Sequence, residues 1–295
     1  MRGPNSNGRY EARLEGQAGV AVYSSAGVTL DRVNVRATYG DGVYLAGDSS
    51  RITVRDGIFE RLGRQGIAPV FASDVVVEAN RFDRVARSVF DLEPAVPRWS
   101  VRDVHLRANT VGTYGNFVLA AGGAGENVSG IWLEANEVTG GNGIAVYAGM
   151  PRWLRHDLHV VDNRSRVAGR VVGATGRAGV MQIARIDGVE IRGNEQPIAD
   201  DGVAISLTDV CHADVRDNDF PGASEAVRRT GDTENCSPEL RGGPPSSRPK
   251  GTTTPDRAGR RAETPRSPPV EDAVGRDWLI ALILGGLAAF AVFLA

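Results

Sequence analysis

The sequence predicts an all-β fold: a single right-handed parallel β-helix solenoid of about eight coils, with a disordered C-terminal linker and one C-terminal transmembrane helix. The first observation behind this prediction is a segment that recurs along the chain. In it two apolar residues bracket one outward residue, and two further residues and then Asn follow. The copies end at Asn80, Asn109, Asn136, Asn163, Asn194 and Asn218. Self-similarity with a spacing of roughly 20 to 50 residues is typical of solenoids and propellers.

The second observation is that apolar and polar residues alternate within each copy. A period of two belongs to strands and excludes helical repeats of similar length. It also specifies the register, because a slip by one residue would expose the whole apolar set. A propeller blade needs longer antiparallel strands and hairpin turns, which this sequence does not contain. We therefore expect short parallel strands stacked coil upon coil.

Residues 1–18 come before the first repeat, and we expect them to form an irregular start. Arg2-Gly3 is similar to Arg192-Gly193 of a later copy, and no segment before residue 19 caps the first coil. Because solenoids need capped ends for solubility, we expect a truncated first coil, with a signal peptide and earlier coils upstream.

Residues 19–236 are expected to form the β-helix itself. Each unit opens on a second apolar stretch, such as 42–45 or 143–146, so one coil contains two or three strands. Each Asn is expected at a tight turn, in the left-handed conformation, with its amide bonded to the coils above and below. The position two before Asn, or before the residue that replaces it in the first two copies, reads Asp31, Arg55, Glu78, Arg107 and Glu134, and the alternation breaks at Val161 and Arg192. Strands about 4.8 Å apart bring such side chains into contact, so the alternating charges favour this stacking.

Residues 237–276 have the composition of a linker, rich in Pro, Ser, Thr, Gly and Arg and poor in aliphatic residues. Such a segment cannot bury a core, and we expect it to be disordered and extended. The apolar run that follows predicts a transmembrane helix over 277–295, with the lipid bilayer as partner of residues 278–295. A helix of that length reaches about 27 Å, just enough for a hydrocarbon core of about 30 Å. A buried helix of a soluble protein is the alternative.

The side of the membrane on which the β-helix lies is indicated by two opposing signals. The arginines of the linker favour a cytoplasmic position. The two cysteines of the chain, Cys211 and Cys236, flank the last coil, and a disulfide between them would need an oxidising, extracytoplasmic setting. Two free thiols are the alternative. We expect the β-helix to be membrane-anchored, extracytoplasmic and monomeric.

The repeats resemble those of the pectate-lyase-like superfamily of right-handed parallel β-helix proteins, over about residues 19 to 224. More narrowly, residues 63–67, followed by Asp91-Leu92-Glu93-Pro94, are similar to uncharacterised bacterial secreted members of that superfamily. The resemblance implies the fold, whereas the superfamily includes lyases, hydrolases, epimerases and adhesins, so it does not imply one function. Of the motifs that form the active site of polygalacturonase-like hydrolases, this sequence has only one similar segment, Asp200-Asp201-Gly202. A turn before Gly202 explains these residues equally well.

The candidate active site is the pair Asp91 and Glu93. Aligning 67–69 with 90–92 places Asp91 outward, and Glu93 follows two residues later on the same side. Residues i and i+2 of a strand lie about 6.6 to 7 Å apart, a separation expected for the two carboxyl groups of an inverting glycoside hydrolase. Arg64 is placed as a partner for a uronate carboxylate or, in a lyase, as the proton acceptor. The alternative is structural: both carboxyl groups hold the loop before Pro94 through Arg98 and Trp99.

Substrate-binding residues are expected around this pair. These are Tyr44, Gln65, Arg98 and Trp132. Trp132 belongs to the outward column Val76, His105, Trp132, His159 and Glu190, which is interpreted either as a platform for sugar rings or as a simple packing ladder. Two coils separate the two histidines, about 9.6 Å, which is too far for them to share a zinc ion. No metal site and no cofactor is therefore expected, apart from Ca²⁺ if the protein is a lyase.

The sequence thus predicts a membrane-anchored β-helix that binds, and in the enzymatic interpretation cleaves, an acidic or neutral polysaccharide on an outward sheet. The alternative is a non-catalytic, adhesin-like surface protein that recognises its partner through the same columns. The net charge of −2 is too balanced for a nucleic-acid partner.

Overall fold

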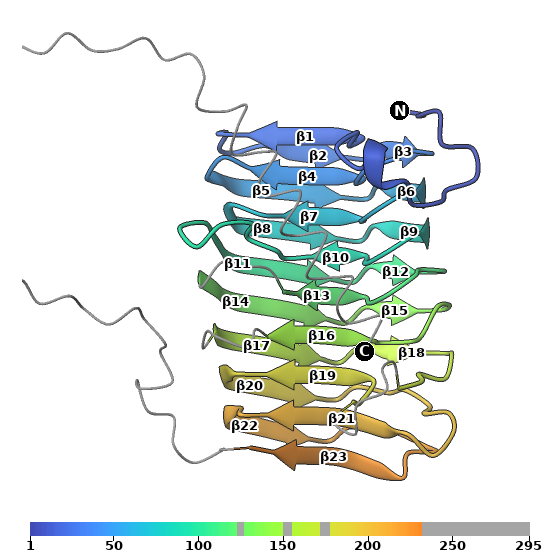
Figure 1. Cartoon of the computed structure of the whole chain (residues 1–295), viewed down its shortest axis with the longest axis vertical. Helices are drawn as coiled ribbons and strands as arrows, with labels where there is room; N and C mark the ends of the chain where they lie inside the picture. Colours follow the sequence, from blue (N-terminus) through green and yellow to red (C-terminus); the bar gives the residue numbers. More distant parts are fainter. Residues whose placement is uncertain (123–126, 150–154, 172–177, 232–295) are drawn as a thin grey trace, which may run out of the picture. The chain divides into compact units, whose positions relative to one another are not determined.

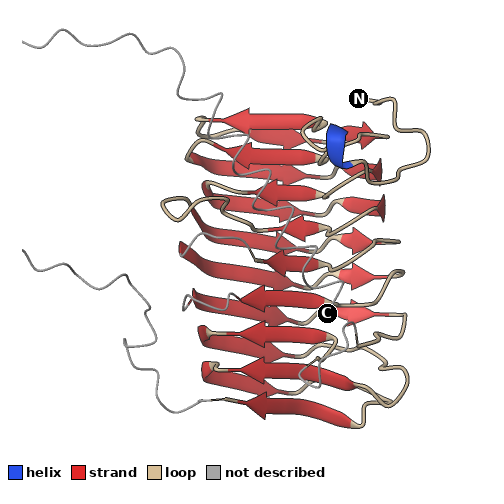
Figure 2. Ribbon diagram, viewed as in Figure 1, coloured by secondary structure: helices blue, strands red, loops and turns tan. Residues whose placement is uncertain are grey.

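The computed structural model describes residues 1–122, 127–149, 155–171 and 178–231. Over this part the chain is an all-β parallel solenoid of about seven turns, compared with the roughly eight coils expected. Its strands stack into three sheets along the solenoid; two of them continue to β22 and β23, and the third ends at β18 (Figures 1 and 2). Strands of consecutive coils pair in parallel, as the repeat predicts.

Each sheet takes about one strand from every coil. The nine-stranded sheet consists of β1 (Val20–Tyr23), β4 (Val43–Ala46), β7 (Ile67–Pro69), β10 (Phe90–Asp91), β13 (Leu119–Ala121), β16 (Val146–Gly149), β19 (Met181–Ala184), β21 (Val203–Thr208) and β23 (Glu225–Thr230). The eight-stranded sheet consists of β2 (Thr29–Asp31), β5 (Ser49–Arg55), β8 (Ala72–Glu78), β11 (Ser100–Arg107), β14 (Asn127–Glu134), β17 (Arg155–Val161), β20 (Ile186–Arg192) and β22 (Cys211–Arg216). The six-stranded sheet consists of β3 (Asn34–Arg36), β6 (Ile58–Leu62), β9 (Arg81–Val85), β12 (Thr110–Val111), β15 (Glu137–Val138) and β18 (Arg164–Ser165).

The core is built from columns of like residues, one from each coil. On the eight-stranded sheet the inward residues that lie in register are Val54, Val77, Leu106, Leu133, Val160 and Ile191, and all are fully buried. Phe59 and Phe82 stack with ring centroids 5.0 Å apart, and Phe82 meets Phe90 edge to face at 5.2 Å. These buried columns of in-register apolar residues confirm the register predicted from the sequence.

The asparagines form a continuous amide ladder inside the turn between the eight-stranded and six-stranded sheets. Asn136 shows the pattern: its Nδ2 donates to Leu106 O at 2.7 Å and to Asn163 Oδ1 at 2.8 Å. Its Oδ1 accepts hydrogen bonds from both Nδ2 and the backbone N–H of Asn109. The predicted bonding between coils is therefore confirmed.

The predicted backbone conformation of these asparagines is wrong. The residue in the left-handed region is the one before each Asn, for example Ala79, Ala108 and Ala135, with φ of 53°, 52° and 50°. The turn needs the Asn amide to point inward between coils. The preceding residue, whose side chain is free to face solvent, therefore takes the positive φ.

The charged column two residues before Asn also stacks as expected. Asp31 pairs with Arg55 at 3.2 Å, and Glu78 pairs with Arg107 at 2.7 Å, in each case across neighbouring strands. Because these pairs are exposed, each contributes at most about 1 kcal/mol, and they specify register more than they stabilise it.

Residues 1–18 are irregular apart from one 3₁₀ turn, η1 (Ala12–Leu14). They lie alongside the first coils: Arg2 bridges to Arg36, and the buried side chain of Asn5 donates to Thr38 O. At the other end, Cys211 is buried at the start of β22. Cys236, the linker 237–276 and the helix predicted over 277–295 lie outside the described residues, so the disulfide stays a prediction. Within the described ranges, no helix is both long and apolar enough to cross a membrane.

Candidate functional site

The outward face of the nine-stranded sheet carries a column in which two tyrosines flank an aspartate. The register places Tyr44, Ala68, Asp91, Ala120 and Tyr147 on the successive strands β4, β7, β10, β13 and β16. At about 4.8 Å per strand, each tyrosine is about 9.6 Å from Asp91 along the axis. The predicted alignment of 67–69 with 90–92 is therefore confirmed, and Tyr44 lies in the predicted column.

Asp91 is outward by register and yet nearly inaccessible, since only 3% of its surface is exposed. Gln65 Nε2 donates to Asp91 Oδ2 at 2.5 Å, while Gln65 Oε1 accepts the backbone N–H of Ser88 at 2.9 Å. Gln65 is itself 3% exposed. Gln65 therefore fixes the orientation of the Asp91 carboxyl group. The Gln65 side chain is itself not accessible to a ligand.

Arg64 is held by two carboxylates of the first coils. Its Nη1 donates to Asp41 Oδ2 at 3.0 Å, and its Nε lies 3.4 Å from Glu15 Oε2. Asp41 also accepts the backbone N–H of Gln65. The Arg64 side chain retains about a fifth of its exposure, so a ligand carboxylate would have to compete with two internal ones.

Glu93 is half-buried and lies beside β13 and β16. A Cβ built on Gly122 would lie 3.1 Å from Glu93 Oε1 and 3.7 Å from the Tyr147 ring. The Glu93 carboxylate therefore occupies space beside Gly122 that a side chain at this position would restrict. Tyr147 is 37% exposed and packs on Phe117 with ring centroids 5.5 Å apart. Glu93 and Tyr147 are therefore neighbours on this face.

Arg155 is a residue of this site that the sequence pattern did not reveal. It is 1% exposed and occupies the inward column that holds Val101, Val128 and Ile186 on other strands. Its guanidinium reaches the end of β13, where Nη2 donates to Gly122 O at 2.6 Å and Nη1 to Ala121 O. A cation thus bonds the backbone of Gly122, the residue that the Glu93 carboxylate approaches.

Burial and neighbouring charges shift the acid–base properties of these groups. Desolvation, followed by the charge of Glu93, raises the pKa of Asp91 well above its ordinary value. Desolvation also raises the pKa of Asp41, against the opposing effect of Arg64. The pKa of Arg155 is lowered to about 10 by burial, with Glu93 opposing the shift. Burial and the neighbouring Glu93 carboxyl group thus both favour the protonated form of Asp91.

Trp132 lies on a different sheet from Asp91. On the eight-stranded sheet its ring is sandwiched between His105 at 4.4 Å and His159 at 4.8 Å, with interplanar angles of 5° and 2°. Because both faces of the indole are covered, they offer no platform for a sugar ring. The packing-ladder interpretation describes this column.

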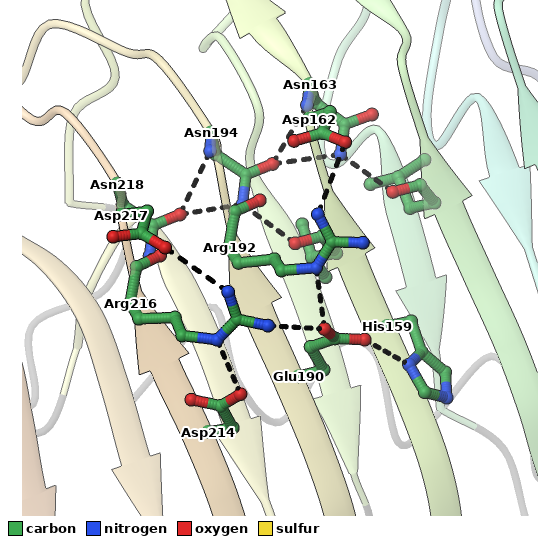
Figure 3. A network of polar contacts seen from close by, with 12 residues as sticks. His159, Asp162, Asn163, Glu190, Arg192, Asn194, Asp214, Arg216, Asp217 and Asn218 are labelled. Atoms are coloured by element: carbon green, nitrogen blue, oxygen red, sulfur yellow. Dashed lines mark hydrogen bonds and ion pairs between the residues drawn. The ribbon is translucent and has the colours of Figure 1, made fainter.

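The ladder ends in a network of charges around Glu190 (Figure 3). Glu190 accepts from Arg192 Nε at 2.7 Å, and its other oxygen lies 2.9 Å from His159 Nδ1. Arg216 reaches the same carboxylate at 3.5 Å from the next strand. The hydrogen bond from His159, followed by those from Arg192, lowers the pKa of Glu190. These groups satisfy one another, and the cluster joins three strands.

The remaining predicted residues make no site together. Arg98 is exposed in the loop before β11, where Trp99 stacks on Phe71 at 5.8 Å. Asp200 and Asp201 both have positive φ, as a turn requires, and Arg170 lies 3.8 Å from Asp200. Among the residues that the structure describes, no three His, Cys, Asp or Glu side chains form a group able to hold a metal ion.

Two hollows of the surface are on the six-stranded sheet, away from Asp91. One, of about 420 Å³, is lined by residues of β9 and β12 and of the turns that follow β12 and β15. A second, of about 270 Å³, is lined by β18 and the next coils. The sequence pattern pointed to neither, since turn residues outside the alternating strands line both.

Comparison with known proteins identifies the fold but no close relative. Residues 7–164, more than half of the 295-residue chain, match the family model described as right handed beta helix region. No curated protein and no solved structure matches the chain. At a coarse level this agrees with the resemblance to the pectate-lyase-like superfamily and gives the solenoid its right-handed sense.

Proposed function

Because the chain belongs to the right-handed β-helix family, we propose that it is a polysaccharide-binding protein that holds an acidic or neutral polymer across its nine-stranded sheet. The observation that carries the proposal is that Tyr44 and Tyr147 share one outward column, with Glu93 beside Tyr147 and the buried Asp91 between the two tyrosines. Aromatic rings present an apolar face to the C–H groups of a sugar, and carboxyl groups bond its hydroxyls. The tyrosines are four strands apart, about 19 Å, so they suit a chain of several sugar units rather than a single one.

Cleavage is a second candidate function, and one observation favours it. Asp91 is a buried acid whose pKa is raised, and Glu93 follows it by two residues, just beyond the end of β10. An inverting glycoside hydrolase uses two carboxyl groups, one as the acid and one as the base. The small exposed fraction of Asp91 weighs against it, because the acid has to reach the glycosidic oxygen. Binding is therefore the first proposal and hydrolysis the second. Lyase chemistry is disfavoured, because the Arg64 guanidinium is already paired with the carboxylates of Asp41 and Glu15.

We further propose the setting in which this binding takes place. The apolar run 278–295 would tether the solenoid to a lipid bilayer, and the linker 237–276 would hold it away from that surface. A Cys211–Cys236 disulfide would fit an extracytoplasmic, monomeric domain. The adhesin-like alternative shares this setting and differs only in having no turnover.

The test compares binding with turnover on a panel of polysaccharides. The chain and its Glu93→Gln, Asp91→Asn and Tyr147→Ala variants are assayed for affinity, for new reducing ends and for the ultraviolet absorbance of unsaturated uronates. We expect Tyr147→Ala to weaken binding about tenfold, because it removes a stacking ring. Glu78→Gln is the matched control, since Glu78 is a half-buried carboxylate on the other sheet.

Each outcome of the panel separates two interpretations. Turnover that is abolished by both carboxyl variants supports hydrolysis, whereas binding without turnover supports the first proposal, of which a non-catalytic, adhesin-like protein is one form. If Tyr147→Ala and Glu93→Gln bind as well as the Glu78→Gln control, the assignment to the nine-stranded sheet is wrong.

A further inference from the structure

The six-stranded sheet carries a hollow of about 420 Å³ that the proposed function does not use. Its lining is mostly polar: Arg81, Asp83, Thr110, Thr113 and Thr139, with Gly112 and Gly140 in the floor. Ligand sites commonly have volumes of roughly 300 to 1,000 Å³. The hollow therefore has room for one or two sugar units.

Close packing of consecutive coils explains why the floor is glycine. A Cβ on Gly112 would lie 2.6 Å from Asp83 Oδ1, and a Cβ on Gly140 would lie 2.9 Å from the backbone of Gly112. Any side chain at either position would displace its neighbour. Without side chains there, the hydroxyl groups of the exposed threonines line an open depression.

The hollow has a net positive charge, which comes from Arg81. Asp83 is already neutralised, because its Oδ1 accepts the backbone N–H of Thr113 at 3.0 Å and its Oδ2 lies 3.3 Å from Arg84 Nε. Arg81 is exposed and, within the described part of the chain, makes no ion pair. An exposed guanidinium beside a satisfied carboxylate favours an anionic ligand, which it can bind through two parallel hydrogen bonds.

Two further features indicate a saccharide rather than a free anion. Ile58 lies in register beside Arg81 on β6 and is 38% exposed, an apolar surface of the kind on which the C–H face of a sugar packs. The second hollow, of about 270 Å³, follows along the same sheet at β18, which pairs with β15. A long polymer would follow both hollows along the solenoid axis.

We propose that the hollow lined by β9, β12 and the turns after β12 and β15 binds an anionic saccharide, with Arg81 on its oxyanion and the hydroxyl groups of Thr110, Thr113 and Thr139 on the sugar hydroxyls. The oxyanion is a carboxylate or a sulfate ester, which share the geometry that Arg81 recognises. The proposal rests on polysaccharide being the ligand class of the protein, and it places a second binding site on a different sheet from Asp91.

The test is isothermal titration calorimetry of the full-length chain with three probes of equal length: oligogalacturonate, sulfated dextran and neutral dextran. We expect Arg81→Gln to weaken both anionic probes at least tenfold and to leave neutral dextran unchanged. Thr110→Val, which keeps the shape and removes the hydroxyl, should weaken all three several-fold. Whichever anionic probe binds more tightly identifies the oxyanion.

Arg102→Gln is the matched control, because Arg102 is also exposed but lies on β11 of the eight-stranded sheet. Equal losses in Arg81→Gln and Arg102→Gln would show non-specific attraction and overturn the proposal. Loss in Tyr147→Ala without loss in Arg81→Gln would overturn it and leave the proposed function standing. Loss in Arg81→Gln alone would support it and displace the site on the nine-stranded sheet, whereas no binding of any probe would overturn both. All four substitutions are at exposed or partly exposed positions, and unchanged thermal melts show that the fold is intact.

Discussion

Gln65 Nε2 donates a hydrogen bond to Asp91 Oδ2 over 2.5 Å, from the turn before β7 to the strand of the next coil. Gln65 is fixed in turn by the backbone N–H of Ser88, so the carboxyl of Asp91 has one orientation. A buried carboxyl group that accepts from a neutral amide gains little compensation for its lost hydration. The pKa of Asp91 is therefore raised, chiefly by burial.

Asp91→Asn should stabilise the protein increasingly as the pH rises. The folded-state pKa of Asp91 is raised, chiefly by burial, so the stability that its proton contributes is present below the unfolded pKa of about 3.9 and is lost as the pH rises through the folded value. Asn keeps an oxygen to accept from Gln65 and does not ionise. Urea unfolding from pH 4 to pH 8 checks this, with Asp103→Asn, an exposed aspartate of β11, as control. A variant no more stable than the wild type at pH 8 would show that Asp91 is ionised at no cost.

Asn136→Ala should cost about 2 to 4 kcal/mol of the free energy of unfolding, because it leaves several buried backbone and side-chain groups without partners. The lost partners are Leu106 O, Asn163 Oδ1 and the two donors of Asn109. Asn218→Ala is the matched control, since it removes the last, part-buried rung of the same ladder and should cost less. Equal losses at the two positions would mean that the ladder acts locally and not through burial.

Ala108→Gly should stabilise the protein by about 0.5 to 1 kcal/mol. Ala108 is exposed and has φ of 52°, a conformation that costs an L-residue roughly 1 to 2 kcal/mol and glycine almost nothing. The greater freedom of glycine in the unfolded chain offsets part of the gain. Thermal unfolding checks this against Ala95→Gly, an exposed loop position without positive φ. A destabilised Ala108→Gly would place the strain elsewhere in the turn.

Much of this architecture is readable in the sequence, because in a parallel solenoid every register is repeated. The columns of Asn, of Asp31 with Arg55 and of Tyr44 with Asp91 all follow from the period of two. That period fails at the left-handed residue inside the longer strands of the eight-stranded sheet, such as Asp103 or Asp157. Before this residue the inward position is displaced by one, so strict alternation places Arg155 outside although it is buried. The burial of Asp91 could likewise not be predicted from the sequence pattern, because it depends on the Gln65 side chain packing against Asp91 from the preceding coil.

Arg155→Met should leave the free energy of unfolding within about 1 kcal/mol of the wild type. Replacing a buried charge by an apolar side chain of similar volume removes a desolvation penalty together with the hydrogen bonds to Ala121 O and Gly122 O. Arg155→Ala should cost about 2 to 4 kcal/mol, because it opens a cavity in the same column. If Met is as harmful as Ala in thermal melts, the two carbonyl contacts, and not the volume, hold this corner.

Glu190→Gln should destabilise the protein near neutral pH and lose that effect in acid. The pKa of Glu190 is lowered by the hydrogen bond from His159 and then by Arg192, so the stability it contributes is present above its unfolded pKa and is lost as the pH falls through the folded value. His159, Arg192 and Arg216 all face this carboxylate, from three strands, so its charge links β17, β20 and β22. Urea midpoints of the wild type and the variant should therefore converge between pH 7 and pH 3. Glu78→Gln, which removes an exposed pair with Arg107 alone, should show a smaller difference at neutral pH. A difference for Glu190→Gln that persists unchanged at pH 3 would mean that the carboxyl packs, rather than bonds, within this network.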